Sequence, residues 1–167
     1  MEKIEQIEKT VKEENIEFIR WLYIDVDNIV RGTVSNAKDL KEKISGGLSI
    51  AACMQSAFGL FDRITPDSVF GFVGEVRLMP DPETFRIAPY AENSALMICD
   101  QYTRTGEVFR ADPRPLLKEV ISRYRHELKA SFENEFYLFR KNESIEPFDR
   151  SMCYSTPGDE RRQRHYA

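Results

Sequence analysis

Two short stretches rich in β-branched and aromatic residues, separated by a tight turn, open the folded part of this chain. The first is IEFIRWLYID, residues 16–25, and the second is IVRGTVS, residues 29–35. Val, Ile, Tyr, Phe and Trp favour strands, whereas the Asp and Asn residues between the two stretches favour a tight turn. The pattern predicts a β-hairpin, and a hairpin of this kind needs further strands or helices to bury its apolar face.

Helices are expected on both sides of this hairpin. Ile4, Ile7 and Val11 recur at helical spacing among Glu and Lys residues and predict a short amphipathic helix. Residues 37–44 form a second candidate, with Ser35 or Asn36 as the cap and Gly46-Gly47 as the stop.

Extended patterns then return in the middle of the chain. They are VFGFVGEVRLMPD (69–81), TFRIAPY (84–90) and ALMICDQYTRTGEVFR (95–110), the last with a hairpin around TRTG. Strands with a few interposed helices, in no regular alternation, predict an α+β fold with a mixed sheet. We therefore expect one domain over residues 1–110, with its boundary near residues 108–112.

A second unit is expected from residue 111. Asp112 suits a helix cap and Pro113 the first helical position. An apolar face running from Leu116 to Leu128 continues that helix, and KASFENEFYLFR (129–140) then has the composition of a strand.

Composition excludes several classes of protein. The chain has 167 residues, 41% of them hydrophobic and 31% charged, with a formal net charge of −4. No basic field draws it to nucleic acid, and no apolar run is long enough to span a bilayer. The cysteines, Cys53, Cys99 and Cys153, lie far apart, as do His126 and His165, so zinc-ligand spacing is absent. We expect a cytoplasmic protein without nucleic-acid or membrane partners.

The most informative local feature is the pair Glu133 and Glu135. If residues 131–139 form a strand, the two carboxylates project from one face, roughly 7 Å apart, while Phe132 and Phe136 point to the other. One interpretation is the solvated face of an ordinary amphipathic strand. The other is a site for hard divalent cations such as Mg²⁺ or Mn²⁺, which prefer oxygen ligands. Spacing alone leaves both open.

Motifs in a fixed order resemble the glutamine synthetase family. FIRWLYIDVDNIVRGTVS resembles the paired strands that open the family's amino-terminal domain. EVRLMPDPETFRIAPYAENSALMICDQYTRTGEVFRADPRPLLKEV resembles its continuation, and SFENEFYLF matches the family's E-x-E-F-x-x-F strand. The series covers roughly residues 14 to 156, and its order makes the resemblance specific.

The resemblance implies a fold and an activity. Residues 1–110 would form a β-grasp-like domain, and residues 111–157 the incomplete start of a catalytic domain. Glu133 and Glu135 would each ligand one of two Mg²⁺ or Mn²⁺ ions. The implied reaction is ATP-dependent: glutamate is phosphorylated on its γ-carboxylate, and ammonia or another amine then forms glutamine or a γ-glutamyl amide. The family works as a homo-oligomeric ring with active sites between subunits.

The chain departs from the family at one active-site loop. A family loop that reaches the neighbouring subunit commonly reads D-G-S-S-I, and its Asp helps to deprotonate ammonium. The equivalent here is GGLSI, residues 46–50, so Gly46 replaces the Asp while Ser49 is retained. Either the missing carboxylate makes room for an amine larger than ammonia, or Gly46-Gly47 is merely a helix stop.

The far end of the chain also departs from the family. Residues 158–167, GDERRQRHYA, do not follow the family pattern, and they read either as a solvated terminus or as the product of a single-base frameshift. The remaining acids, nucleotide site and glutamate-binding arginines of the family are not in these 167 residues. We therefore expect the chain alone to be inactive. The alternative function is a non-catalytic β-grasp module that joins or caps glutamine synthetase-like rings.

Overall fold

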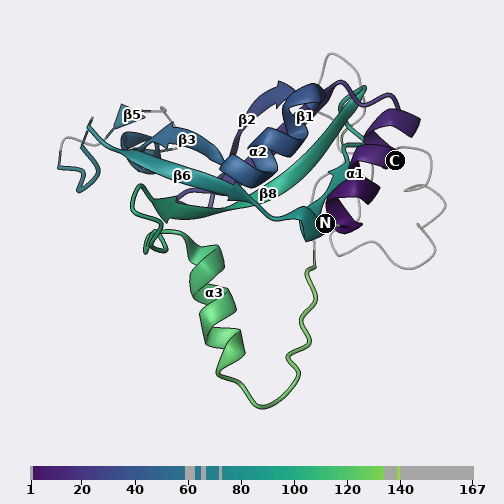
Figure 1. Cartoon of the computed structure of the whole chain (residues 1–167). Helices are drawn as coiled ribbons and strands as arrows, with labels where there is room; N and C mark the ends of the chain where they lie inside the picture. Colours follow the sequence, from purple (N-terminus) through teal and green to yellow (C-terminus); the bar gives the residue numbers. More distant parts are fainter. Residues whose placement is uncertain (1, 59–62, 65–66, 72, 134–138, 140–167) are drawn as a thin grey trace. The chain divides into compact units, whose positions relative to one another are not determined.

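A computed structural model describes residues 2–58, 63–64, 67–71, 73–133 and 139 (Figure 1). The chain divides into two compact units, residues 1–127 and 128–167. The tail at 158–167 lies outside the described residues. Among the helices that are described, none combines the length and apolarity needed to cross a bilayer.

The helices and strands of the first unit alternate irregularly. The α-helices are α1 (Glu2–Glu13), α2 (Leu40–Gly46) and α3 (Pro113–Ser122). The short 3₁₀ helices are η1 (Ala37–Asp39), η2 (Ala52–Ser56) and η3 (Pro82–Thr84). The strands are β1 (Phe18–Ile24), β2 (Val30–Asn36), β3 (Leu48–Ala51), β4 (Ala57–Phe58), β5 (Arg63–Ile64), β6 (Glu75–Pro80), β7 (Arg86–Ile87) and β8 (Ser94–Thr103).

These strands form a mixed sheet of six strands in the order β2-β1-β8-β6-β3, with β7 also paired to β8. β1 runs parallel to β8, and every other pairing in the sheet is antiparallel. β4 and β5 form a separate two-stranded ribbon. The predicted α+β class with a mixed sheet is confirmed.

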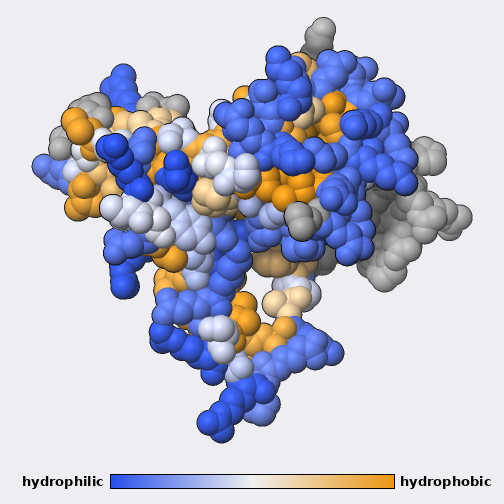
Figure 2. All heavy atoms as spheres, viewed as in Figure 1, coloured by the Kyte–Doolittle hydropathy of each residue, from blue (hydrophilic) through white to orange (hydrophobic). Residues whose placement is uncertain are grey.

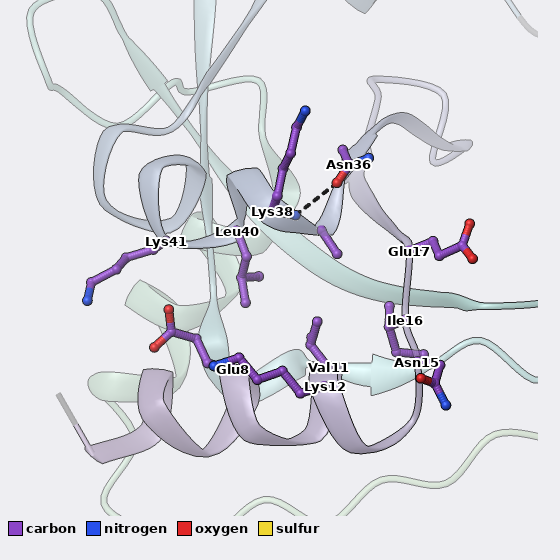
Figure 3. A pocket seen from close by; sticks show the side chains of 11 residues that line it. Glu8, Val11, Lys12, Asn15, Ile16, Glu17, Asn36, Lys38, Leu40 and Lys41 are labelled. Atoms are coloured by element: carbon purple, nitrogen blue, oxygen red, sulfur yellow. Dashed lines mark hydrogen bonds between the residues drawn. The ribbon is translucent and has the colours of Figure 1, made fainter.

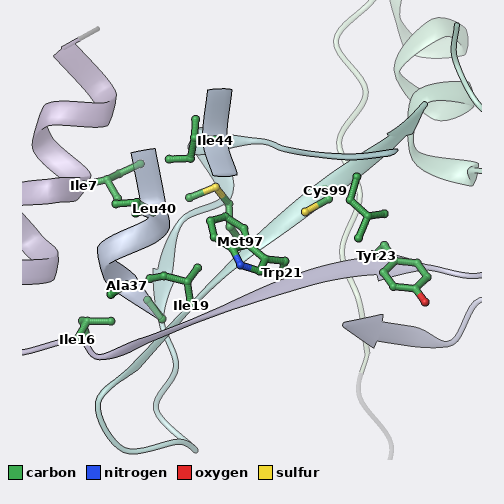
Figure 4. Packing of buried hydrophobic residues seen from close by; sticks show 12 residues of the cluster. Ile7, Ile16, Ile19, Trp21, Tyr23, Ala37, Leu40, Ile44, Met97 and Cys99 are labelled. Carbon is green, nitrogen blue, oxygen red and sulfur yellow. The ribbon is translucent and has the colours of Figure 1, made fainter. Parts of the chain in front are cut away.

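The apolar core lies on one face of this sheet, beneath α1 and α2 (Figure 4). Trp21 of β1 and Met97 of β8 are fully buried there, against Ile7 of α1 and Leu40 of α2. Their side chains alternate with half-exposed ones along each strand, because successive strand residues point to opposite faces. The Trp21 indole Nε1 donates to Ser35 Oγ at 3.0 Å, so this polar atom is satisfied too.

The predicted hairpin is confirmed, and the buried carboxylate of Asp25 closes its turn. Asp25 Oδ1 accepts the N–H groups of Asp27 and Ile29, both at 2.9 Å, and Oδ2 pairs with Arg31 Nε at 2.6 Å. Both oxygens of a carboxylate that is 1% exposed therefore have partners.

The end of β8 depends on Asp112. β1 runs beside β8 only as far as Ile98, so later backbone groups of β8 need other partners on that side. Asp112 Oδ2 accepts the N–H of Gln101 at 2.7 Å, and the N–H of Phe109 donates to the Gln101 carbonyl at 3.0 Å. Asp112 Oδ1 accepts from Arg114 N, which confirms the predicted helix cap. Burial raises the pKa of the Asp112 carboxyl, and the two N–H donors offset that only in part.

Four charged side chains hold α3 on the sheet. Arg114 Nη1 lies 2.5 Å from Asp100 Oδ1, and its Nη2 lies 2.7 Å from Asp81 Oδ2. Lys118 Nζ contacts the same two carboxylates, at 2.5 Å from Asp100 and 3.4 Å from Asp81. Because Cys99 and Gln101 belong to the buried face, Asp100 projects from the opposite one. We call these four residues the α3 clamp.

The apolar side of α3 remains uncovered in the described part of the chain. No residue of the helix is buried, and Figure 2 shows apolar side chains of α3 at the surface. The exposed set, each at 41% to 57%, comprises Leu116, Leu117, Val120 and Ile121 of the helix and Tyr124 just beyond its end. The clamp, rather than apolar packing, therefore fixes this helix.

The structure differs from the sequence-based expectations for the residues that follow Asp112. α3 ends at Ser122, and its apolar face does not continue as helix to Leu128. The first compact unit extends past the predicted boundary near 108–112, since the clamp ties α3 to the sheet. The domain boundary itself stays a prediction. Residues 131–133 are not in a strand, and most of the predicted strand lies outside the described residues.

Loss of the clamp should release α3. Arg114→Met removes two ion pairs of a guanidinium that is 21% exposed, and we expect a loss of about 1–2 kcal/mol of stability. Limited trypsin digestion should then cut faster at Lys118 and Arg123. Arg104→Met is the matched control, because Arg104 is exposed and its ion pair with Glu75 is long at 3.9 Å. Equal digestion rates for the two variants would contradict the role of the clamp.

The clamp should also give an acid-sensitive contribution to stability. Burial alone would raise the pKa of Asp81, but hydrogen bonds from Arg114 and the Glu83 N–H outweigh it, so the pKa is lowered from 3.8. A lowered folded-state pKa adds stability above the unfolded value, and this is lost as pH falls through the folded value. Urea titrations at about pH 6 and about pH 3 should therefore differ less for Asp81→Asn than for the parent chain. The same difference for exposed Asp67→Asn should stay unchanged.

Candidate functional site

The loop at residues 46–50 places its two glycines in different surroundings. Gly47 ends α2 with φ +73° and donates its N–H to the Lys43 carbonyl. A Cβ at Gly47 would meet Met79 Sδ at 2.6 Å and the Leu78 carbonyl oxygen at 2.8 Å. At Gly46, the last residue of α2, a Cβ would meet nothing within 4 Å. Gly47 alone therefore supplies the helix stop, and nothing in the fold requires a glycine at position 46.

Ser49 follows on β3 and is exposed. It pairs in register with Arg77 of β6, whereas its neighbours Leu48 and Ile50 pair with the buried Leu78 and Val76. Since residues directly opposite each other share a face, the Ser49 hydroxyl lies on the sheet face opposite the core. Its side chain is thus open to a partner, as the predicted active-site role requires.

A chain of buried amides fixes the segment after this strand. Gln55 of η2 donates from Nε2 to Gln101 Oε1 at 2.6 Å, and Gln101 Nε2 donates to the Ile24 carbonyl at 2.8 Å. Both glutamines are at most 1% exposed. Sequence reasoning missed this link, since Gln55 lies in an almost uniformly apolar stretch that indicated only burial. The link joins η2 to β8 and β1, and so fixes where β3 ends.

The predicted metal ligands are not brought together in the described residues. Glu133 belongs to the second unit, is exposed, and has no ion pair in the part of the chain that the structure describes. Glu135 lies outside the described residues. Among those that are described, no group of three His, Cys, Asp or Glu side chains is arranged to hold a metal ion. The metal-binding role of Glu133 and Glu135 stays a prediction.

A groove of about 590 Å³ runs between α1 and the η1–α2 segment (Figure 3). Val11, Ile16 and Leu40 form its apolar floor, and Figure 3 shows Lys38 and Lys41 pointing away from that floor. The remaining charged residues have mixed sign, so the groove favours no particular ligand charge. It was not anticipated from the sequence, because it depends on how α1 packs against α2.

The structure is an α+β domain in which the loop at residues 46–50 leads into β3. Comparison with known families identifies the class of protein to which this domain belongs. The family model described as "Glutamine synthetase N-terminal domain" matches residues 1–115. The chain belongs to the glutamine synthetase family. The resemblance inferred from the sequence is confirmed.

Curated relatives show the same membership. The chain is similar to glutamine synthetase of Methanococcus maripaludis, with 27% identity over 85% of this chain and 33% of the relative. It is 30% identical to glutamine synthetase of Halobacterium salinarum over 80% of this chain and 29% of the relative. A gamma-glutamylanilide synthase from Acinetobacter is 29% identical over 74% of this chain and 28% of the relative. The chain therefore spans about a third of the length of these relatives.

Solved structures share the fold. A structure titled as a novel glutamine synthase homolog has a TM-score of 0.58 and 26% identity, covering 66% of this chain and 27% of that one. The apo form of a protein titled GmaS has a TM-score of 0.54 and 21% identity, covering 70% of this chain and 25% of that one. Both likenesses support the amino-terminal α+β domain.

The two glycines of the loop provide a matched test. Gly46→Ala should stabilise the chain by about 0.5–1 kcal/mol, since alanine favours a helix and meets no neighbour. Gly47→Ala should destabilise it by more than about 1 kcal/mol, because φ is positive and the Cβ clashes. Chemical denaturation of both variants measures the difference. Equal effects of the two substitutions would contradict the assignment of Gly47 as the helix stop.

Proposed function

We propose that this chain is the amino-terminal part of an ATP-dependent ligase that joins glutamate to ammonia or to a larger amine. The observation that carries the proposal is the family match over residues 1–115, followed in sequence by Glu133 and Glu135 at the family's metal-binding positions. Glutamine synthetase relatives and a gamma-glutamylanilide synthase relative support the two choices of amine. We place this reaction in the cytoplasm, where it would serve nitrogen assimilation.

Glu133 and Glu135 would hold two Mg²⁺ or Mn²⁺ ions. Glu133 fits this role because its carboxylate is exposed and has no cationic side chain bound to it in the described residues. Bound metals would neutralise the repulsion between the ATP phosphates and the glutamate γ-carboxylate. The chain's own contribution is to orient the two carboxylate ligands.

The glycine at position 46 favours the proposal that the substrate is an amine larger than ammonia. The family's Asp at this position can accept a proton from ammonium, whereas glycine has no side chain with which to do so. The open space around Gly46 means that the fold did not dictate this loss. Ser49, exposed two residues beyond the helix stop, would line the entrance used by the amine.

The uncovered apolar side of α3 supports the proposal that this chain is part of a longer protein and that this protein forms an oligomeric ring. Four exposed apolar side chains on one helix, with Tyr124 just beyond its end, are held in position by the α3 clamp and present a surface that further chain would bury. In the proposed enzyme this surface packs against the rest of the catalytic domain. The amino-terminal sheet then lies against a neighbouring subunit.

The same surface favours the second candidate function. A non-catalytic module that joins or caps rings of full-length subunits needs an exposed apolar contact, and α3 supplies one. Mixing the chain with the Methanococcus maripaludis enzyme tests this candidate by light scattering. Association that Leu117→Glu abolishes supports the module, and no association of the parent chain rejects it.

A chimera tests the catalytic proposal. Residues 1–157 of this chain replace the matching third of the Methanococcus maripaludis enzyme, and phosphate release is measured with ATP, glutamate and a series of amines. We expect no turnover by the 167-residue chain alone, because two carboxylates do not preorganise metals and substrates. The chimera should prefer an alkylamine or arylamine, and Gly46→Asp should shift its preference toward ammonium by about tenfold.

The carboxylate variants complete this experiment. Glu133→Gln and Glu135→Gln should each lower the turnover of the chimera by at least about a hundredfold and weaken Mn²⁺ activation. Glu14→Gln, an exposed carboxylate of the amino-terminal unit, is the control and should retain activity. If the chimera forms its ring and both variants keep full turnover, the metal-binding proposal is wrong.

A further inference from the structure

Arg20 lies on the sheet face opposite the core and has no ion pair in the described part of the chain. Its Nε is buried and has no hydrogen-bond partner among the described residues, which is costly for a donor. An acceptor supplied from outside does not reach the buried Nε, but it can bond to the two Nη groups, which are not among the buried atoms without a partner.

The contacts around Arg20 leave its donors open. Its guanidinium carbon lies over the Tyr90 ring, 5.8 Å from the ring centroid, in a cation–π contact. This contact does not supply an oxygen or nitrogen acceptor for the N–H groups. On the adjacent strands Arg20 is directly opposite Val34 and Leu96, which carry no acceptor side chain.

A second arginine lies in the same row of the sheet. Arg86 of β7 is directly opposite Leu96 of β8, which is itself opposite Arg20 of β1. Arg20 and Arg86 therefore project from one face, with backbones two strands or about 10 Å apart. Arg86 Nη1 donates to the carbonyls of Phe85 at 2.6 Å and Glu83 at 3.2 Å, which steadies the side chain. Arg86 likewise has no ion pair within the described ranges.

Nearby acids form no ion pair with either arginine in the described residues. The carboxylate of Glu17, three residues before Arg20, accepts from Asn93 Nδ2 at 3.4 Å. Glu83 has its carboxylate paired with Lys3 at 3.3 Å. Two guanidinium groups without an ion pair in the described part of the chain thus share a face, and the other residues in their row, Val34 and Leu96, are apolar.

We infer that Arg20 and Arg86 form a binding site for a small oxyanion, either a phosphate group or a short dicarboxylate. The planar donors of Arg20 suit two oxygens of one anionic group, and Arg86 adds a second positive charge across the row. The Tyr90 ring lies 5.8 Å from the Arg20 guanidinium carbon and helps to hold the side chain in place. This site lies in the amino-terminal unit and does not rest on the proposed catalytic function.

Titration of the full 167-residue chain tests the site. Inorganic phosphate and succinate are added separately, with sodium chloride at matched ionic strength, and the Nε–H resonances of arginine are followed by ¹⁵N–¹H NMR. We expect saturable shifts of the Arg20 Nε–H signal with at least one of the two anions. The stronger of the two responses identifies the group as phosphate-like or carboxylate-like.

Three variants separate a specific site from general attraction. Arg20→Lys keeps the charge but loses the planar pair of donors, and should weaken calorimetric affinity by about tenfold or more. Arg86→Gln should weaken it several-fold. Arg110→Gln removes an exposed arginine from the segment between β8 and α3 and should leave affinity unchanged.

The outcomes decide the proposal in either direction. Selective loss in Arg20→Lys and Arg86→Gln supports the site. Equal loss in all three variants, or shifts that sodium chloride reproduces, would reduce the effect to ionic strength and overturn it. No response of the parent chain to either anion would overturn it as well. If Arg20→Lys does not fold, the Arg20 signal in the parent chain and the affinity of Arg86→Gln still decide.

Discussion

The buried carboxylate of Asp112 joins the sheet to α3. One oxygen accepts the N–H of Gln101 where β1 no longer accompanies β8, and the other caps the first turn of α3. The same Gln101 uses its side chain to link η2 and β1. A single strand position therefore ties together the hairpin, the segment after β3 and α3. Together with the α3 clamp, this arrangement explains how a helix without a buried residue keeps a defined place on the domain.

The hairpin, the helix caps and the α+β class followed from the sequence because each rests on local chemistry. Asn36 and Asp112 cap helices through their own side chains, and the turn at Asp25 uses residues within a few positions of one another. The α3 clamp and the amide chain of Gln55 and Gln101 were not predictable in this way. Each joins side chains that are distant in sequence. The pairing of β6 with β8 and the packing of η2 against β8 bring these side chains together. The Glu133 and Glu135 prediction rests on the resemblance, since spacing along a strand does not distinguish a metal site from a solvated face.

The glycine pair shows where a sequence pattern is ambiguous and geometry is not. Gly46-Gly47 reads equally as a helix stop or as a modified active-site loop. The structure separates the two functions, because the positive φ and the contact with Met79 belong to Gly47 alone. Gly46 is then free to vary without cost to the fold. A substitution that the fold does not need is a better candidate for a change in substrate than one that it does.

The two faces of the sheet have different roles: one stabilises the fold, and the other is available for contacts. One face carries the apolar core beneath α1 and α2, where burial supplies most of the favourable free energy. The opposite face carries Ser49, Asp100, Arg20 and Arg86, assigned to it by the register of the strands. Because alternation along a strand allows the second face to change without disturbing the first, a family can keep one fold while its contacts diverge. The unpaired guanidinium of Arg20 is best understood on this basis. A charge that contributes nothing to the core and has no ion pair in the described part of the chain is held at a cost, and contact of its Nη groups with an anion outside the domain would offset that cost.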